Sequence, residues 1–168
     1  RALATVEEAK FPYVSCNFYH EKNGVAGDPV LESYKVFDMN GTKVAFVGIT
    51  TPESFTKSTP AYFQDANGKY IYGIAAGKDG AALYAAVQKA IDAASKEADY
   101  VIALGHLGDD PSSQPWTSEE VIAHTTGLDA FIDGHSHSTV EMKQVKDKAG
   151  NTVVLSQTGS YFAAIGEM

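Results

Sequence analysis

Two stretches of the chain decide its fold, 100-YVIALGHLG-108 and 130-AFIDGHSHS-138. Each begins with an apolar, partly β-branched run that predicts a short buried strand, and each continues into glycine and histidine. Between them, residues 117–124 predict a helix, because Thr117 or Ser118 is a favourable N-cap and two glutamates follow in the first turn. The order strand, helix, strand predicts a right-handed βαβ unit with parallel strands.

Three histidines follow these two strands. Because parallel strands end at the same edge of a sheet, His106, His135 and His137 are predicted to lie together at the edge where α/β sheets bind ligands. Gly105 and Gly134 precede two of them, which removes a side chain beside that edge. Neutral imidazole suits Zn, Mn, Fe, Co and Ni, and three such nitrogens plus a water complete a catalytic zinc site. We therefore predict a metal site here, and the alternative is that the three are ordinary loop histidines.

The rest of the chain predicts a mixed α/β protein. The segment 38–43 contains Asn40-Gly41 between two β-rich runs, a strong signal for a β-hairpin. Residues 78–98 predict a helix from their apolar spacing and alanine content, whereas residues 21–29 predict a polar loop and 51–77 a long irregular segment. Further strands are predicted at residues 12–18, 32–37, 44–50, 140–146, 152–157 and 161–166.

Composition bounds the class of protein. The length of 168 residues predicts a single core, and 44% hydrophobic with 20% charged residues excludes a disordered, collagen-like or coiled-coil chain. The 13 basic and 21 acidic residues give a net charge of −8, which disfavours nucleic acid as a partner. The longest apolar run, Ala81 to Val87, is far short of the ~18 residues of a transmembrane helix. The start at Arg1, without a targeting segment, leads us to expect a piece of a longer protein.

Weaker candidates have ordinary structural explanations. His20 and His124 are interpreted as surface residues. Cys16, the single cysteine, lies in an apolar run without a basic neighbour, and we interpret it as a small hydrophobic residue that leaves the redox compartment open. Three loop carboxylates are candidate acceptors for the second N–H of a ligand histidine: Asp109, Asp110 and Asp133. An interpretation of these three as ordinary solvated side chains is at least as consistent with the sequence. Core or loop packing, rather than stacking on a ring-shaped ligand, is favoured for Trp116, Tyr62, Tyr70 and Tyr72.

Several segments, in this order, resemble the calcineurin-like metallophosphoesterases, specifically the 5′-nucleotidase branch with its UDP-sugar hydrolases and cyclic-nucleotide phosphodiesterases. The specific matches are KVAFVGITTPES and the two histidine motifs ALGHLG and GLDAFIDGHSHS; FPYVSCNFY and SQTGSYFAAIGEM are supportive. The family's three earlier motifs, Asp-x-His, Gly-Asp and Gly-Asn-His-Glu, do not occur in this sequence. The resemblance therefore implies that residues 1–168 are the C-terminal portion of a metallophosphoesterase catalytic domain.

By the same resemblance, the expected fold is α/β: part of a four-layer α-β-β-α sandwich, a mixed sheet with flanking helices. His106 and His135 are expected to bind one ion of a dinuclear site and His137 the other, in a parent enzyme that hydrolyses nucleotide phosphomonoesters with two divalent metal ions. The motif whose histidine acts on the leaving group is missing, so no catalytic or nucleoside-binding residue is assigned. The chain alone is expected to be inactive, and the parent to be extracellular, periplasmic or at the cell surface.

Two alternatives remain open at this point. One is a non-catalytic metal-binding or interaction module in which the three histidines hold a single structural ion. The other is a hydrolase of sulfur-linked or sugar-nucleotide substrates. The missing portion of the family fold also implies an apolar sheet face without cover, from which we expect self-association.

Overall fold

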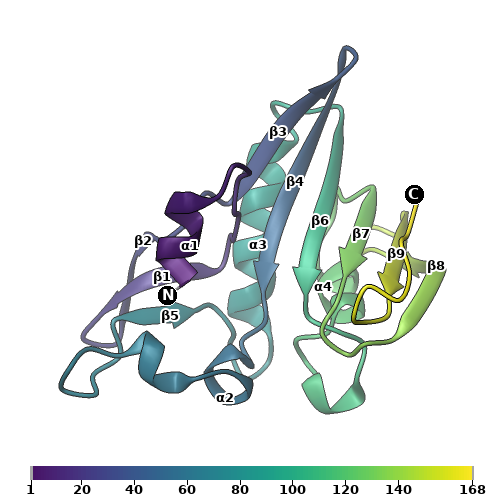
Figure 1. The fold of residues 1–168 in the computed structure, drawn as a ribbon. Coiled ribbons are helices and arrows are strands. Elements are labelled where there is room, and N and C mark those ends of the chain that lie inside the picture. Colours follow the sequence, from purple (N-terminus) through teal and green to yellow (C-terminus); the bar gives the residue numbers. More distant parts are fainter. Residues whose placement is uncertain (1, 168) are drawn as a thin grey trace.

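The computed structural model describes residues 2–167 and places the strands in two sheets (Figure 1). The six-stranded sheet has the order β3-β4-β6-β7-β9-β8, and the three-stranded sheet has the order β2-β1-β5. The strands are β1 (Phe18–Lys22), β2 (Val25–Pro29), β3 (Tyr34–Met39), β4 (Thr42–Thr50), β5 (Tyr72–Ile74), β6 (Tyr100–His106), β7 (Ala130–Asp133), β8 (Thr139–Lys146) and β9 (Thr152–Thr158). The helices are α1 (Ala2–Glu8), α2 (Ser54–Lys57), α3 (Ala81–Ala94) and α4 (Ser118–His124), with short 3-10 turns η1 (Pro60–Phe63) and η2 (Pro111–Ser113).

The larger sheet is mixed, as the sequence predicts. Its central strands β4, β6, β7 and β9 are parallel, and the edge strands β3 and β8 are antiparallel to their neighbours. The predicted βαβ unit is confirmed: β6, α4 and β7 follow one another, and the two strands pair side by side with Ile102 opposite Ala130. The predicted cap is confirmed too, because the Thr117 side chain accepts a hydrogen bond from the backbone N–H of Glu120.

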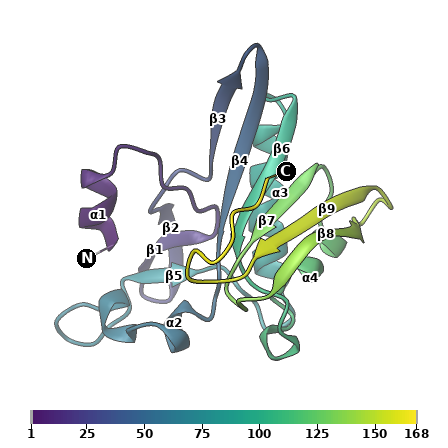
Figure 2. The ribbon, with the colours of Figure 1, turned by 45° about the vertical axis from the view of Figure 1, so that its right-hand side comes forward.

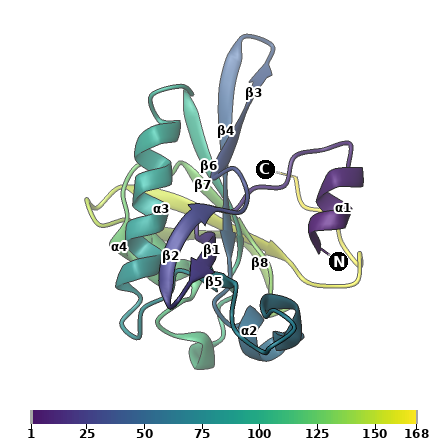
Figure 3. The ribbon, with the colours of Figure 1, turned by 90° about the vertical axis from the view of Figure 1, so that its left-hand side faces the viewer.

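The two helices α3 and α4 cover one face of this sheet, whereas α1 and the C-terminal segment lie on the other side (Figure 3). Leu83, Val87 and Ile91 of α3 are fully buried with Val47 of β4 and Phe131 of β7 in one hydrophobic cluster. This is the packing expected of an amphipathic helix on a parallel sheet. In a second view, the C-terminal segment runs back from β9 across the front of the sheet (Figure 2).

Asn-Gly turns close two hairpins, of which the sequence analysis predicted one. Asn40 and Gly41 have φ of +57° and +92°, the left-handed values that a two-residue hairpin turn requires, and they join β3 to β4. Asn23 and Gly24 have φ of +57° and +76° and join β1 to β2 in the same way. The prediction of a polar loop over residues 21–29 was therefore wrong, because the turn formers at 27–29 obscured a short, exposed strand.

Three other predicted elements differ from the structure. In the region predicted as a strand at residues 12–18, the structure has an isolated bridge at Val14, and β1 begins at Phe18. The helix predicted at 78–98 is shorter and spans Ala81–Ala94; its start is delayed because Gly80 adopts a left-handed conformation immediately before α3. Residues 161–166, predicted as a strand, form a turn and an irregular segment. A strand needs a neighbour for its hydrogen bonds, and no described strand pairs with this segment.

Residues 51–77 are largely irregular, as predicted, and contain α2, η1 and the short strand β5. None of the helices within residues 2–167 combines the length and apolar content needed to cross a membrane.

Candidate metal site at the carboxyl edge of the sheet

The carboxyl ends of β4, β6 and β7 form the candidate site. Thr50, the last residue of β4, is in register with His106, the last residue of β6. His135 follows two residues after the end of β7. Parallel pairing thus delivers these loops to one edge, as the sequence analysis expected.

The rings of His106 and His135 lie together, with centroids 4.9 Å apart and planes inclined by 66°. A side chain at Gly105 would place its Cβ 2.4 Å from the ring of Phe131, and one at Gly134 would meet Nδ1 of His106 at 3.4 Å. Close packing against Phe131 therefore requires glycine at position 105. Glycine at position 134 lets the backbone lie close to the imidazole of His106. Burial lowers the pKa of His106, and the neighbouring His135 and His137 lower it further against an opposing effect of Asp133. The neutral, metal-binding form of His106 is thus favoured.

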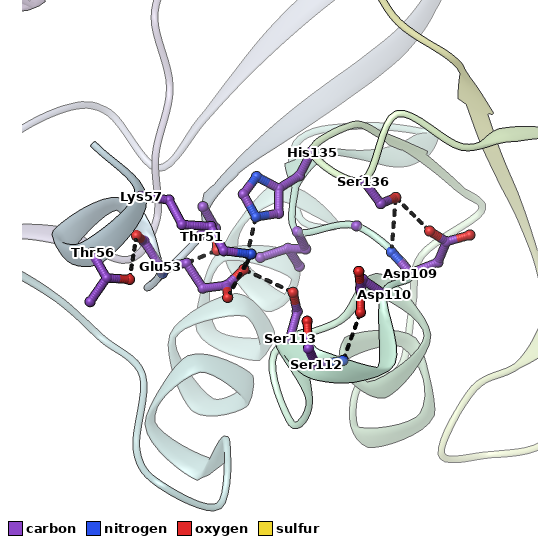
Figure 4. A network of polar contacts seen from close by, with 12 residues as sticks. Thr51, Glu53, Thr56, Lys57, Asp109, Asp110, Ser112, Ser113, His135 and Ser136 are labelled. Atoms are coloured by element: carbon purple, nitrogen blue, oxygen red, sulfur yellow. Dashed lines mark hydrogen bonds and ion pairs between the residues drawn. The ribbon is translucent and has the colours of Figure 1, made fainter.

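Glu53 joins His135 to two other loops at this edge (Figure 4). Its Oε2 lies 2.8 Å from Nε2 of His135 and accepts a hydrogen bond of 2.8 Å from the Ser113 hydroxyl. The ammonium of Lys57 lies 3.0 Å from Oε1 and 3.1 Å from Oε2. The side chains of Glu53 and His135 are only 11% and 13% exposed. Burial raises the pKa of Glu53, but the hydrogen bonds from Lys57, Ser113 and His135 outweigh it, so the pKa is lowered overall.

The backbone of the histidine loop adopts conformations that non-glycine residues rarely take. His135 has φ of +93° and His137 has φ of +60°. Such residues persist where the surrounding contacts hold them, and they cluster at ligand sites. Here Ser136 and Ser138 donate hydrogen bonds of 2.5 and 2.7 Å to Oδ1 of Asp109, which ties this loop to the one that follows β6. The hydrogen bond from Ser136 lowers the pKa of Asp109, and the one from Ser138 adds to it, against the opposing effect of burial.

Asp133 holds the backbone beside His106 rather than a histidine ring. Its two carboxylate oxygens accept hydrogen bonds of 2.9 Å from the backbone N–H groups of Leu107 and Gly108. Asp109 accepts from serines and Asp110 from the backbone of Ser112. The structure thus gives these three candidate carboxylates partners other than His106, His135 or His137. The Glu53 carboxylate does contact His135, and it was not among the residues predicted from the sequence.

His137 packs edge-on against Tyr161, with centroids 5.4 Å apart and planes at 67°. Within residues 2–167, no three His, Cys, Asp or Glu side chains surround a common metal position. The structure therefore brings together His106 and His135 and does not gather all three imidazoles around one ion.

The remaining candidates pack as ordinary structural residues. His20 contacts Tyr72 at 5.2 Å between centroids, and His124 stacks on Tyr84 at 4.3 Å. The indole of Trp116 donates to the carbonyl of Gly77 and packs against the core. Cys16 is partly buried against that core, and burial raises the pKa of its thiol to about 12. The interpretation of Cys16 as an unreactive hydrophobic residue is consistent with this environment.

The donor set fits part of a metal site. His106 and His135 are imidazoles at neighbouring strand ends, and the histidine–carboxylate contact at His135 is the arrangement commonly found behind metal-bound histidines. Two side chains provide fewer ligands than a closed site needs. The geometry matches one part of a larger coordination sphere.

Solved structures define the class of fold. The chain superposes with a TM-score of 0.65 on the sulfate thiohydrolase SoxB of Thermus thermophilus at 18% identity, covering 94% of this chain and 25% of that one. A 5′-nucleotidase precursor from the same organism gives 0.65 at 20% identity over 92% and 29% of the two chains. The calcineurin-like phosphoesterase YfkN of Bacillus subtilis gives 0.62 at 22% identity over 91% and 48%. The chain has a metallophosphoesterase fold, and the predicted mixed sheet with flanking helices is confirmed.

The chain belongs to the family described as bacterial capsule synthesis protein PGA_cap, whose model matches residues 26–156. Curated relatives include the trifunctional nucleotide phosphoesterase protein YfkN of Bacillus subtilis, 26% identical over 96% of this chain and 11% of the relative. The protein UshA of Salmonella pullorum is 26% identical over 86% of this chain and 25% of the relative. The chain thus spans between a tenth and a quarter of these relatives. The predicted kinship with the 5′-nucleotidase branch is confirmed.

Proposed function

We propose that this chain contributes one part of the active site of a metal-dependent phosphoester hydrolase that acts on nucleotide phosphomonoesters. His106 and His135 hold one divalent ion of a dinuclear site, and His137 belongs to the second. Residues 1–168 form the C-terminal portion of the catalytic domain. The observation that carries this proposal is the 4.9 Å approach of the His106 and His135 rings at the carboxyl edge of the sheet.

The contacts around these rings support a ligand role. Glu53 fixes one side of His135, and Asp133 fixes the backbone that follows His106 through two hydrogen bonds. The lowered pKa of His106 favours the neutral imidazole, which is the form that binds a metal ion. When bound, divalent ions supply a hydroxide nucleophile near neutral pH and stabilise charge on phosphoryl oxygens. Zn, Mn, Fe, Co and Ni all suit imidazole ligands.

The names of the relatives favour the substrate class. YfkN is named a nucleotide phosphoesterase, and another relative, from Vibrio vulnificus, is named a 5′-nucleotidase and is 34% identical over 33% of this chain. A sulfate thiohydrolase shares the fold, so sulfur-linked substrates are the competing class. We propose a site of action outside the cytoplasm, at the cell surface or in the periplasm, which the resemblance to the 5′-nucleotidase branch supports. Fractionation of cells that express the parent protein tests this location.

Metal titration of the chain tests the proposal. We expect zinc or manganese to bind in a calorimeter, and His106→Ala and His135→Ala to reduce the affinity at least about tenfold, because each removes one imidazole ligand. His20→Ala is the matched control, since His20 lies in the small sheet against Tyr72. Equal metal affinity of the wild type and the three variants would contradict the assignment of His106 and His135 as ligands.

Phosphatase assays on the chain and on the parent protein test the catalytic part. We expect metal-dependent hydrolysis of nucleotide monophosphates by the parent and none by the chain alone. An inactive parent contradicts the enzyme assignment, whereas strong turnover by the chain contradicts its assignment as part of a site.

The alternative of an inert module with one ion on three histidines predicts a single tight site that needs His137 as much as His106. Among residues 2–167, no three such side chains surround a common metal position, which disfavours this alternative.

A further inference from the structure

Among the described residues, Glu53 is the only carboxylate hydrogen-bonded to one of the three predicted ligand histidines, and it sits where three loops meet (Figure 4). Glu53 follows β4, Ser113 lies in η2 after β6, and His135 follows β7. Oε2 of Glu53 contacts the Ser113 hydroxyl, the Lys57 ammonium and Nε2 of His135 at 2.8, 3.1 and 2.8 Å. One oxygen atom therefore connects the loops that follow three neighbouring parallel strands, β4, β6 and β7.

These contacts determine which nitrogen of His135 carries a proton. An ionised carboxylate only accepts hydrogen bonds, and the Lys57 ammonium only donates them. With Lys57 beside both its oxygens, Glu53 is an acceptor, so the atom 2.8 Å away on His135 must be a donor. Nε2 then bears the hydrogen, and the lone pair of the neutral ring is on Nδ1.

We propose that Glu53 is a positioning residue for the metal site. By accepting the Nε2–H of His135, it fixes the ring and its tautomer so that Nδ1 is the nitrogen available to a metal ion. The proposal rests on the proposed function in so far as His135 is a ligand, and it adds a role for a residue of the Thr-Pro-Glu segment. Lys57 and Ser113 act through Glu53, because they hold its carboxylate against the ring.

The surroundings of the pair suit this role. Both side chains are nearly buried, so water competes little for the hydrogen bond. The φ of +93° at His135 shows a backbone held in an uncommon conformation, and the contact with Glu53 is a direct restraint on that residue. A carboxylate behind a metal-bound histidine raises the basicity of the ligand nitrogen and fixes its orientation, and losing it typically lowers metal affinity about 10–100-fold.

The first test measures the tautomer without metal. Nitrogen-15 NMR of the metal-free chain at about pH 8.5, where ordinary histidines are neutral, reports the protonated nitrogen of each ring, and His135→Asn assigns the signal. We expect a slowly exchanging Nε2–H on His135 in the wild type and its loss in Glu53→Ala. Glu53→Gln retains an acceptor oxygen and is expected to recover part of the signal. A wild-type proton on Nδ1, or an unchanged signal in Glu53→Ala, overturns the proposal.

The second test measures zinc and manganese affinity by calorimetry. Glu53→Ala is expected to bind about 10–100-fold more weakly than the wild type, with Glu53→Gln in between. Glu32→Ala is the matched control, because it removes a glutamate from an exposed ion pair with Lys35 and is expected to change nothing. Equal or tighter binding by Glu53→Ala shows that the carboxylate is dispensable or competes with the metal, and it overturns the proposal.

The two measurements separate this inference from the proposed function. If the wild-type chain binds neither metal, the metal assignment fails, while the NMR experiment still decides whether Glu53 sets the tautomer of His135. Should Glu53→Ala not fold, as seen by circular dichroism, Ser113→Ala provides the same comparison with one donor to Glu53 removed. It is expected to weaken metal binding less than tenfold, and an affinity equal to that of the wild type contradicts the proposed support through Glu53.

Discussion

The two faces of the six-stranded sheet are built from the same strands but meet different surroundings. On the face that α3 and α4 cover, one cross-strand row is completely or almost completely buried: Val47, Ala103, Phe131 and Leu155. On the opposite face, the adjacent rows remain apolar but are partly exposed, as at Leu104 and Ile132 with 38% and 37% of their surface accessible. The strands are therefore apolar on both faces, as in sheets that have a layer on each side.

The difference between the two faces shows that the described residues provide a helical layer for one face of the sheet and leave the other face partly uncovered. The helix-covered face gives the core that holds the parallel strands in register, and thereby the carboxyl edge with His106 and His135. The opposite face, called the open face below, keeps accessible apolar surface at Leu104 and Ile132, although α1 and the C-terminal segment lie on that side (Figure 3). The comparison predicts that changes on the two faces have different consequences.

Substitutions at neighbouring positions of β7 provide the largest expected contrast. Phe131→Ala removes a fully buried ring and is expected to lower the free energy of unfolding by about 3–5 kcal/mol. Ile132 lies on the opposite face, and Ile132→Ala is expected to lower the free energy of unfolding by about 1–2 kcal/mol, because this side chain is already partly exposed. Urea unfolding in dilute solution measures both values. Similar losses at the two positions would show that the faces are equally covered.

Association through the open face is the next expected effect. We predict that a second copy of the chain covers the exposed apolar rows, because an exposed apolar face is usually hidden by association and identical chains usually associate as symmetric pairs. Light scattering should give a mass above the 17.9 kDa of one chain, and the double variant Leu104→Lys/Ile132→Lys should return it to that value. Gln144→Lys on the exposed edge strand β8 is the control for added charge. A wild-type mass of one chain, without binding of an apolar dye, contradicts this prediction.

The reactivity of Cys16 tests the covered side without changing the core. Burial raises the pKa of the thiol to about 12, so almost no thiolate forms at about pH 8.5. The higher nucleophilicity of that thiolate offsets part of this effect, and we expect labelling by an aromatic disulfide at least about tenfold slower than for a free cysteine. The rate should rise with pH up to the limit of folding and should reach the free value in denaturant. Equally fast labelling in the folded chain would show that Cys16 is open to solvent.

A smaller effect is expected at the start of α4, one of the two covering helices. Thr117→Ala removes the side-chain acceptor for the backbone N–H of Glu120 and should lower the free energy of unfolding by about 1 kcal/mol. Thr59→Ala is the comparison, because Thr59 is exposed before η1 and makes no side-chain capping hydrogen bond, and a change of a few tenths is expected. Thermal unfolding measures the difference. A gain in stability for Thr117→Ala would contradict the capping role.

Much of the larger sheet is predictable because its signals are local. The apolar run in β4 and the Asn40-Gly41 turn each specify an element without reference to distant residues. The C-terminal segment shows the limit of such signals. Tyr161 and Phe162 favour a strand by type, yet both have left-handed backbone conformations in the structure, because a strand also requires a partner.

The candidate site divides in the same way. The approach of His106 and His135 follows from the parallel βαβ unit, which is a rule of topology. The contact of Glu53 with His135 joins residues 82 positions apart, and nothing in the spacing of the two indicates it. The signal was nevertheless present, since Thr-Pro-Glu directly follows β4, and β4 ends at the same edge as β6.

Anomalous X-ray diffraction from crystals of the chain grown with zinc or manganese locates a bound metal ion and shows which nitrogen atoms hold it. We expect a metal peak at the carboxyl edge of the sheet, bonded to His106 and to Nδ1 of His135, with Glu53 hydrogen-bonded to Nε2 of that ring. A fully ordered structure with no peak at these two histidines, or with the metal bound to His20 or His124 instead, would contradict it.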